Sequence, residues 1–524
     1  MTVLKGGDYR APWQTGLLKP LALRWGLVAG LGIVGIAGLT TLRQPEFGDG
    51  QAYMIPNALI MSRTFNPFIE DEVHPPFYFL LEGIAFRIFG AHVEAAHSLA
   101  LLFSLGTVAA TYAVGSCLAG PHVGSIAALL LACWPPFLVQ STLVRLDVPV
   151  AALTVATLLA AVKGWPVAYA VVGSLAALTK APGVLVSCVL AVFGIVRIWK
   201  PRFQRIVLWV PIAVYVGWLV ACKIRFGWFL YPENVQDFSL LHHLDRIWDG
   251  TLFWTRRLMV DQMAWVPLGA GLVAGAWGRW VLMLPVAACA GVAAVAPRIS
   301  LAEGTAVGLF LALSVVAWTC GRSYRALPAV AMATILLFCS YLYRFPRYLL
   351  PAWPGLAVCA ASGLGRRRGG WAIALASAVL MGATAFNGML VTLSGWPAHE
   401  STFDHLRYVR ARKVAATYLR AKAPDKIIVA GGKAAEDLSI PALGYVDAPL
   451  RVVAPRSDCR SLARASYYYE ISSQPQRPEE KETWQRLKRC NLRTSIAMAG
   501  SWRAPFTKGS VLLYYLDSPG VSTP

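Results

Sequence analysis

Charged side chains are scarce in this sequence, and acidic ones are the scarcest. Only 14% of the 524 residues are charged, with 27 Asp and Glu against 48 Lys and Arg, whereas 56% are hydrophobic. An average water-soluble globular domain carries about 25% charged residues. The composition therefore excludes an ordinary soluble protein, and we expect an integral membrane protein.

Apolar runs of about 15–23 residues recur along the chain, and a helix of about 20 apolar residues crosses the hydrocarbon core of a bilayer. We therefore predict an α-helical polytopic protein with about 13 transmembrane helices. The break at Thr179-Lys180-Ala181-Pro182-Gly183 leaves open whether two of the spans are one broken helix. The predicted spans are 22–42, 95–118, 123–144, 147–162, 165–179, 183–199, 206–222, 262–277, 280–296, 305–319, 327–343, 348–363 and 371–393.

The distribution of Lys and Arg predicts the topology. Basic residues gather before the first span and in the loops around 197–205, 322–325 and 366–368, which the positive-inside rule places in the cytoplasm. Loop 43–94 and everything after Leu393 then lie outside. The formal net charge of +21 is explained by these topology signals and by anionic lipid head groups, so no nucleic acid is expected. We expect no cleavable signal peptide, because no small-residue cleavage site follows the first apolar run.

The composition becomes that of a water-soluble domain after Trp396. Residues 426–432 have the pattern of a buried strand that ends in a turn, and a helical pattern runs from Val409 to Ala421 before it. Further strands are predicted at 450–454, 494–498 and 511–516. We therefore divide the chain into a membrane domain, 1–396, and a small extracytoplasmic α/β domain, 397–524.

The cysteines also lack the spacing found in metal-binding motifs. Eight of the ten cysteines lie in or beside apolar runs, where they are expected to be small buried hydrophobic residues. The other two, Cys459 and Cys490, fall in the C-terminal domain. An oxidising compartment would favour a disulfide between them.

The predicted spans hold few ionisable residues near their middles, and no internal repeat is evident. Ion and substrate pathways usually need such groups, so a pump or carrier is disfavoured. Ionisable residues gather instead at the outer ends of the spans, which indicates a site at the outer membrane interface. They include Asp49, His74, Arg145, Asp147, Lys180, Lys223, Arg225, Arg344 and Arg347.

Several segments resemble a known family. The first outer loop has Gly48-Asp49-Gly50 with Tyr53, followed by His74-Pro75-Pro76-Phe77-Tyr78. Together with Arg145-Leu146-Asp147, 178–183 and 345–351, these segments resemble the polytopic glycosyltransferases of the C-type (GT-C) fold. That group includes protein O-mannosyltransferases, aminoarabinose transferases of lipid A and galacturonosyltransferases of lipopolysaccharide. The resemblance covers most of the membrane domain and extends weakly to the C-terminal domain.

The resemblance implies a sugar donor carried on a polyprenyl phosphate and an acceptor on the outer face. Asp49 is then the candidate general base for an inverting transfer. The alternative for Asp49 is an Asx turn or a helix N-cap, which Gly-Asp-Gly also favours. Many relatives have a second acidic residue next to this Asp, where this chain has Gly48 and Gly50, so a charge-sharing or metal-binding role of that neighbour is in doubt.

His74 is a second catalytic candidate, which could hydrogen-bond the donor phosphate or orient Asp49, or could simply pack at the entry of segment 75–89. Aminoarabinose transferases tend to carry Lys at this position. Arg145, Lys180 and Arg347 are candidates for binding the donor phosphate. Alternatively, Arg145 and Asp147 form a local ion pair, and the other two cations extend to lipid head groups.

Tyr53, Tyr78, Asp147, His242 and His243 are candidates for contacts with the acceptor or the sugar. The last two belong to an aromatic-rich loop, 223–261, which is either an acceptor lid or an aromatic belt. Their spacing does not fit a two-His metal site, so no metal and no cofactor are expected. The acidic run 70–72 leaves a divalent cation open as an alternative, beside a solvated loop.

Three functions follow from these patterns. The first is an inverting glycosyltransferase of the bacterial inner membrane, with a polyprenyl-phosphate-linked sugar, membrane lipid, and a glycolipid, polysaccharide or protein acceptor as partners. The second is a transporter or flippase for lipid-linked saccharides, and the third is a cell-envelope scaffold.

Overall fold

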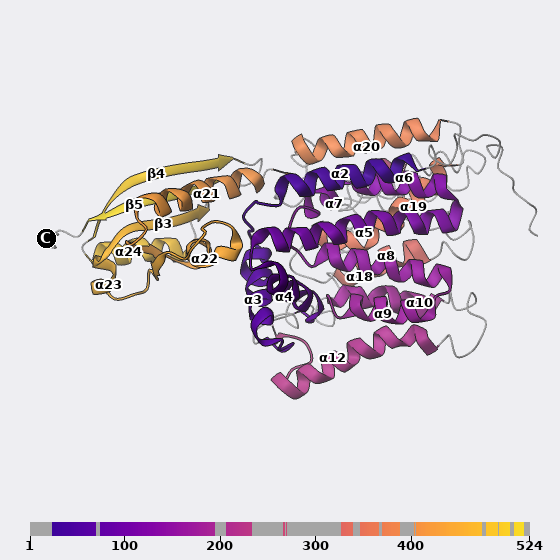
Figure 1. Cartoon of the computed structure of the whole chain (residues 1–524), viewed down its shortest axis with the longest axis horizontal. Helices are drawn as coiled ribbons and strands as arrows, with labels where there is room; N and C mark the ends of the chain where they lie inside the picture. Colours follow the sequence, from indigo (N-terminus) through magenta and orange to yellow (C-terminus); the bar gives the residue numbers. More distant parts are fainter. Residues whose placement is uncertain are drawn as a thin grey trace, which may run out of the picture.

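The chain forms a helical bundle with a small α/β domain at one end (Figure 1). The computed structural model describes residues 24–69, 74–193, 206–232, 266–267, 269, 326–338, 346–365, 369–387, 403, 405–473, 478–490, 492–503 and 508–517. The predicted spans 262–277, 280–296 and 305–319 lie wholly or almost wholly outside these residues.

Several of the apolar helices that build the bundle end at glycine, and others begin at proline. Gly120, at φ +94°, separates α5 from α6, and Gly164, at φ +69°, ends α8, because this backbone conformation is easy only for glycine. The elements are α2 (Trp25–Thr41), the π-helical turn η1 (Gly50–Met54), α3 (Ile55–Thr64), α4 (Phe77–Phe89), α5 (Val93–Ala119), α6 (Pro121–Ala132), α7 (Pro135–Gln140), α8 (Asp147–Lys163), α9 (Pro166–Ala177), η2 (Ala181–Val184), α10 (Leu185–Phe193), η4 (Val207–Trp209), α12 (Val210–Phe226), α18 (Ala326–Phe338), η8 (Pro346–Ala352), α19 (Trp353–Leu364) and α20 (Gly370–Asn387).

The prediction of one helix over 123–144 is wrong. Helix α6 ends at Ala132, and the short α7 starts at Pro135. Trp134 between them is extended (φ −66°, ψ 121°), because a residue before proline avoids the helical conformation and Pro135 has no N–H to continue the ladder. At the break over 179–183, which the sequence left open, Lys180 is also extended and separates α9 from η2 and α10.

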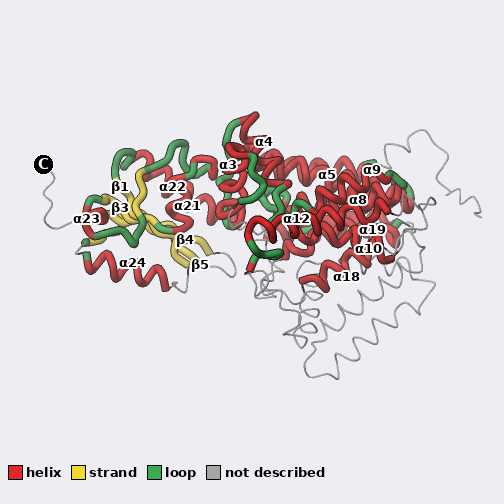
Figure 2. Tube along the Cα trace, turned by 90° about the horizontal axis from the view of Figure 1, so that it is seen from below, coloured by secondary structure: helices red, strands yellow, loops and turns green. Residues whose placement is uncertain are grey.

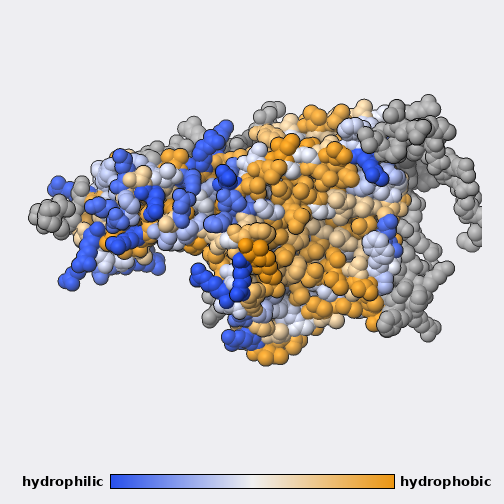
Figure 3. Space-filling model, in the orientation of Figure 1, coloured by the Kyte–Doolittle hydropathy of each residue, from blue (hydrophilic) through white to orange (hydrophobic). Residues whose placement is uncertain are grey.

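The bundle core is closely packed, and its outer surface is apolar. Trp134 and Trp353 stack at its centre with ring centroids 5.5 Å apart, and both are fully buried. By length and composition, the helices 93–119 and 207–226 could each cross a membrane, and several apolar helices are shorter. Figure 3 shows a hydrophobic exterior over the bundle and a hydrophilic one over the α/β domain. This is the surface expected of a bundle immersed in lipid.

The α/β domain contains a five-stranded mixed sheet of order β2-β1-β3-β5-β4. Strand β1 pairs in parallel with β2 and β3, whereas β5 pairs antiparallel with β3 and β4. Figure 2 shows the strands in yellow, at the end of the molecule away from the bundle. A disulfide joins Cys459 to Cys490, with Cα atoms 5.2 Å apart. The elements are α21 (His405–Lys422), β1 (Ile427–Ala430), α22 (Gly432–Ser439), η11 (Pro441–Leu443), β2 (Arg451–Val453), α23 (Cys459–Ala463), β3 (Ala465–Ser473), α24 (Pro478–Arg489), β4 (Arg493–Arg503) and β5 (Lys508–Asp517).

The two parts share one hydrophobic core at their junction. Phe47, Tyr78 and Val93 from the bundle belong to the same buried cluster as Leu443 and Tyr445 from the α/β domain. In Figure 1 the helices α3 and α4 lie at this end of the bundle, facing the domain. The segment between α2 and η1, which contains Asp49, therefore lies at the junction of the two parts.

Candidate active site

Asp49 lies in the connection between α2 and η1, and the glycines on both sides of it are required by packing. Gly48 has φ +62°, and a Cβ atom there would lie 2.7 Å from Nη2 of Arg145. A Cβ atom on Gly50 would overlap the side chain of Glu46. A side chain at either position would therefore require Arg145 or Glu46 to move from the place it has in this structure.

The Asp49 carboxylate is held by two arginines while remaining open to solvent. Its Oδ2 accepts a hydrogen bond from Nη2 of Arg347 at 2.7 Å, and its Oδ1 lies 3.9 Å from Nη1 of Arg145. The side chain of Asp49 is 45% exposed, whereas those of Arg347 and Arg145 are 5% and 4% exposed. Asp49 stands at the N-cap position of η1 but makes no capping hydrogen bond, so its side chain is used for the ion pairs.

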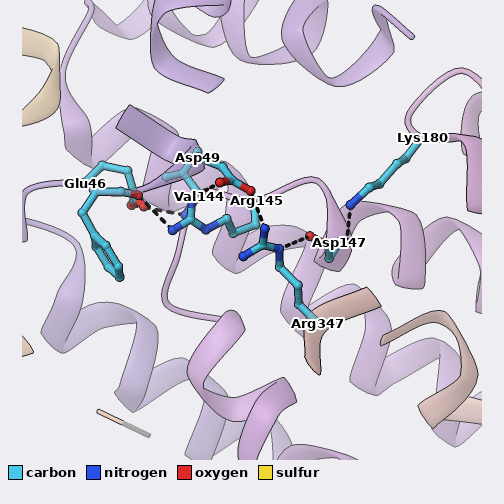
Figure 4. Close-up of polar contacts among 8 residues, drawn as sticks. Glu46, Asp49, Val144, Arg145, Asp147, Lys180 and Arg347 are labelled. Carbon is cyan, nitrogen blue, oxygen red and sulfur yellow. Dashed lines mark hydrogen bonds and ion pairs between the residues drawn. The ribbon is translucent and has the colours of Figure 1, made fainter. Parts of the chain in front are cut away.

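Asp147, at the first position of α8, ties two of the cations together (Figure 4). Its Oδ1 accepts a hydrogen bond from Nζ of Lys180 at 2.6 Å, and its Oδ2 lies 3.3 Å from Nε of Arg347. Arg347 therefore bridges Asp49 and Asp147. The ring of Tyr348 lies 4.7 Å from Nζ of Lys180, a cation–π contact.

Arg145 is fixed separately, by the turn that precedes Asp49. Its Nη2 donates to the carbonyl oxygen of Phe47 at 2.9 Å, and its guanidinium lies 5.3 Å from the centre of the Phe47 ring. The ion pair that Arg145 makes is thus with Asp49, and Asp147 pairs with Lys180 and Arg347. These contacts differ from the alternative prediction, in which Arg145 and Asp147 form a local ion pair.

The cluster carries more positive than negative charge. Three cations, Arg145, Lys180 and Arg347, surround the two carboxylates of Asp49 and Asp147. Burial alone would raise the pKa of Asp49, but Arg347, Arg145 and Lys180 together hold this pKa well below its usual range. Asp49 is therefore ionised at any ordinary pH, and one positive charge is left to attract an anion.

His74 lies within electrostatic range of this cluster. Burial lowers the pKa of His74 to about 3, and the positive charges of Lys180 and Arg347 add to this effect, although Asp49 opposes it. The imidazole is accordingly neutral, so it can donate or accept a hydrogen bond but adds no charge to the site.

The other predicted contact residues are dispersed. Tyr53 on η1 is 52% exposed. Tyr78 on α4 is fully buried, with its ring 5.8 Å from that of Phe103, so this position does not present it to an acceptor. His242 and His243 lie outside the described residues.

A buried carboxylate that the sequence analysis did not select lies next to Asp49. Glu46 is fully buried, and its Oε2 accepts from the backbone N–H of Val144 at 3.3 Å and lies 3.3 Å from Nε2 of His97. Burial raises the pKa of Glu46 to about 7, although Arg145 opposes this shift. The signal in the sequence was an acid between Pro45 and Phe47, three residues before Asp49.

The described residues include no group of three or more His, Cys, Asp or Glu side chains that could hold a metal ion. The acidic run 70–72 lies outside the described part of the chain.

No protein-family model and no curated protein matches the chain. Solved structures do match. The apo structure of ArnT from Cupriavidus metallidurans has a TM-score of 0.53 and 15% identity, over 94% of this chain and 98% of ArnT. ArnT bound to undecaprenyl phosphate has a TM-score of 0.51 and 15% identity, over 95% of this chain and 99% of ArnT. The chain has the GT-C fold. The GT-C fold that the motifs predict is therefore confirmed, whereas the number of transmembrane helices stays a prediction.

At 15% identity the likeness establishes the GT-C fold and no residue roles, so the chemistry has to come from this chain's own side chains. Within the GT-C fold observed here, an accessible carboxylate stands beside three buried cations. Such an arrangement can accept a proton from a nucleophile and stabilise a phosphate at the same place.

Proposed function

We propose that this protein is a membrane glycosyltransferase that moves a sugar from a polyprenyl phosphate to an acceptor, with inversion at the anomeric carbon. Asp49 is the general base. Arg347, Lys180 and Arg145 bind the phosphate.

The observation that carries this proposal is the ion cluster around Arg347. Buried cations that are paired only with carboxylates of the same chain usually serve structure. Here one of those carboxylates, Asp49, is nearly half exposed, and the cluster has a surplus positive charge. A guanidinium donates in a fixed fork that matches phosphate oxygens, so an incoming phosphate can compete with Asp49 for Arg347.

The proposed reaction forms one bond to the anomeric carbon and breaks another. The oxygen or nitrogen of the acceptor attacks the anomeric carbon from the face opposite the phosphate, and its proton passes to a carboxylate oxygen of Asp49. The bond between the anomeric carbon and the phosphate oxygen breaks, and its electron pair leaves with the polyprenyl phosphate. Arg347 and Lys180 stabilise the negative charge that develops on this leaving group.

The low pKa of Asp49 in the empty site makes it a weak base. The donor corrects this, because a phosphate that binds Arg347 and Lys180 neutralises the cations that depress the pKa of Asp49. Donor binding would therefore raise the basicity of Asp49 only when a sugar is present to be attacked. In this proposal the neutral His74 hydrogen-bonds the phosphate or Asp49.

A lipid-linked donor also fits the surroundings of the site. The apolar exterior of the bundle suits a polyprenyl chain, and ArnT, with the same fold, has been captured with undecaprenyl phosphate. We place the site and the C-terminal domain on the outer face of the bacterial inner membrane, with the N-terminus in the cytoplasm, following the charge distribution of the loops. The acceptor is a glycolipid, a polysaccharide or a protein.

The test uses membranes that contain the wild-type protein or D49N, incubated with radiolabelled sugars on undecaprenyl phosphate. We expect wild-type membranes to form a labelled product from one of the donors, and D49N to lose this transfer by a factor of at least about 100. If no lipid-linked sugar is transferred, or if D49N transfers as fast as wild type, the proposal fails and the flippase or scaffold becomes the better account.

A further inference from the structure

Gln51 links the Asp49 turn to the interior of the α/β domain. It is fully buried in η1, two residues after Asp49. Its Nε2 donates to the carbonyl oxygen of Lys433 at 2.8 Å and to Oδ1 of Asp437 at 3.0 Å. Its Oε1 accepts from Nη2 of Arg412 at 2.8 Å. Both ends of this amide are therefore engaged by the C-terminal domain.

The partners of Gln51 belong to a buried charge network. Arg412 and Asp437 are fully buried and form an ion pair, in which Nε of Arg412 donates to Oδ2 of Asp437 at 2.9 Å. The hydroxyl of Tyr469 donates to the same oxygen at 3.1 Å. The guanidinium also contacts two aromatic rings, 4.8 Å from the centre of Tyr408 and 4.6 Å from that of Tyr445.

The other side of the Asp49 turn is held by the same domain. The backbone N–H of Glu46 donates to the carbonyl oxygen of Leu443 at 3.0 Å. The ring of Phe47 stacks on His405, with centroids 5.3 Å apart. Asp49 thus projects from a short segment that the α/β domain holds before and after it.

We infer that the C-terminal α/β domain positions the Asp49 carboxylate, and that Gln51 is the positioning residue that transmits this constraint. The inference rests on the proposed function in so far as Asp49 is the base. A buried network whose members hydrogen-bond one another specifies a single conformation, and a reacting carboxylate has to be held within about 0.5 Å of its productive position. The π-helical form of η1 agrees with such a constraint, because π turns recur at functional sites.

This inference gives the α/β domain a role that does not require it to contact the acceptor. The domain would act through Gln51 on the orientation of Asp49 and would not change how Arg347 and Lys180, which come from the bundle, bind phosphate. Loss of Gln51 should therefore affect the rate of the chemical step and leave donor affinity unchanged.

The test compares Q51L with C459S/C490S in the full-length protein. The second variant removes the disulfide of the α/β domain and controls for a general loss of stability there. Two readouts are needed: transfer kinetics, with affinity for undecaprenyl phosphate, and hydrogen–deuterium exchange of the segment 47–55. We expect Q51L to lower kcat by about 100-fold, as a displacement of about 1 Å can. Exchange at 47–55 should rise, and affinity for undecaprenyl phosphate should change less than about 3-fold.

A chemical swap provides the rescue. In Q51E two carboxylates face each other beside Arg412, whereas Q51E/D437N restores one carboxylate and one amide in exchanged positions. We expect the double variant to recover only part of the kcat that Q51E loses, because a carboxylate at position 51 cannot donate to the carbonyl oxygen of Lys433 and an amide at position 437 offers Arg412 one acceptor oxygen instead of two. If Q51L does not fold, the comparison of Q51E with Q51E/D437N still tests whether Gln51 positions Asp49.

The inference is overturned if exchange at 47–55 in Q51L equals that of C459S/C490S, or if the swap recovers no activity. It is also overturned if exchange rises in Q51L while kcat stays at the wild-type value and D49N is inactive. If D49N is as active as wild type, the proposed function fails instead, and the exchange data alone then report whether the domain orders the turn.

Discussion

Two charge networks flank the turn that carries Asp49, and they differ in how far they are closed. Around Arg412 and Asp437 the charges are fully buried and hydrogen-bonded within the α/β domain. Around Arg347 the cations are equally buried, yet their partner Asp49 has a side chain that is 45% exposed. The same kinds of residue thus form a sealed network on one side of the turn and an accessible one on the other.

We therefore expect the sealed network to stabilise the fold and the accessible network to bind ligand. A sealed ion pair can only specify a conformation, because any ligand would first have to break it. An accessible carboxylate beside surplus cations can exchange one partner for another. Four substitutions test whether the two networks behave in these different ways.

The largest effect is expected in the accessible network. R347M removes the guanidinium that would stabilise the leaving phosphate, and such losses lower kcat by about 100-fold to 1,000-fold. The fold should survive, because Asp147 keeps Lys180 as a partner and Asp49 can be hydrated. Transfer assays together with thermal unfolding of the purified variant would check this. If R347M lowers the melting temperature but the folded protein still transfers sugar at the wild-type rate, the accessible network is structural, like the sealed one.

The matched substitution in the sealed network, R412M, should act on stability. It leaves the carboxylate of Asp437 buried without its cation, and breaking a buried pair in this way costs about 3–5 kcal/mol. Denaturant unfolding of the α/β domain, followed by tryptophan fluorescence, would measure the change. A free energy of unfolding equal to that of wild type would show that this pair is not structural.

A third substitution tests a buried carboxyl group outside both networks, that of Glu82. Glu82 on α4 is fully buried, and both of its carboxylate oxygens lack a hydrogen-bond partner among the described residues. Burial raises the pKa of Glu82 from 4.5 to about 8, so its neutral form is favoured in the folded state. The associated stability is complete below pH 4.5 and is lost as the pH rises towards 8.

E82Q stays neutral at every pH and should therefore gain stability over wild type as the pH rises from 5 to 8, by a few kcal/mol at the end of this range. Melting temperatures measured across this range would show the divergence. E94Q makes the same substitution at a partly exposed glutamate and serves as the matched control variant. Parallel curves for E82Q and wild type would contradict the account of Glu82.

The smallest effect is expected at His74. Its pKa of about 3 keeps the imidazole neutral from pH 5 to 9, so a neutral side chain that also donates a hydrogen bond should replace it. H74Q should retain transfer to within about 10-fold and leave the shape of the pH–rate profile unchanged. A shift of the acidic limb in H74Q would show that a charged His74 takes part.

The fold could be predicted from the sequence where local signals are strong. Long apolar runs predicted most of the described helices, and short strand-like segments predicted β1, β2, β4 and β5. The strand β3, in the middle of the sheet, was missed, although Tyr467-Tyr468-Tyr469 is a β-favouring run. The prediction of a single helix over 123–144 was wrong because the apolar composition continues through this segment, whereas the prolines at 135 and 136 interrupt the helix.

At the site, the residue types could be predicted and their pairing could not. Asp49, Arg145, Asp147, Lys180 and Arg347 were all selected from motifs, but Asp49 and Arg347 are 298 residues apart and meet only in the folded chain. Gln51 was missed because a neutral amide carries no signal until its partners in the α/β domain are known.

The affinity of D49N for undecaprenyl phosphate tests the central claim most directly, namely that one set of cations serves first the carboxylate and then the phosphate. Removing the charge of Asp49 frees Arg347 and Arg145, so D49N should bind undecaprenyl phosphate as tightly as wild type or more tightly, even though it no longer transfers sugar. Binding that is weakened as strongly as transfer would contradict the account, because Asp49 would then hold the site together rather than compete for its cations.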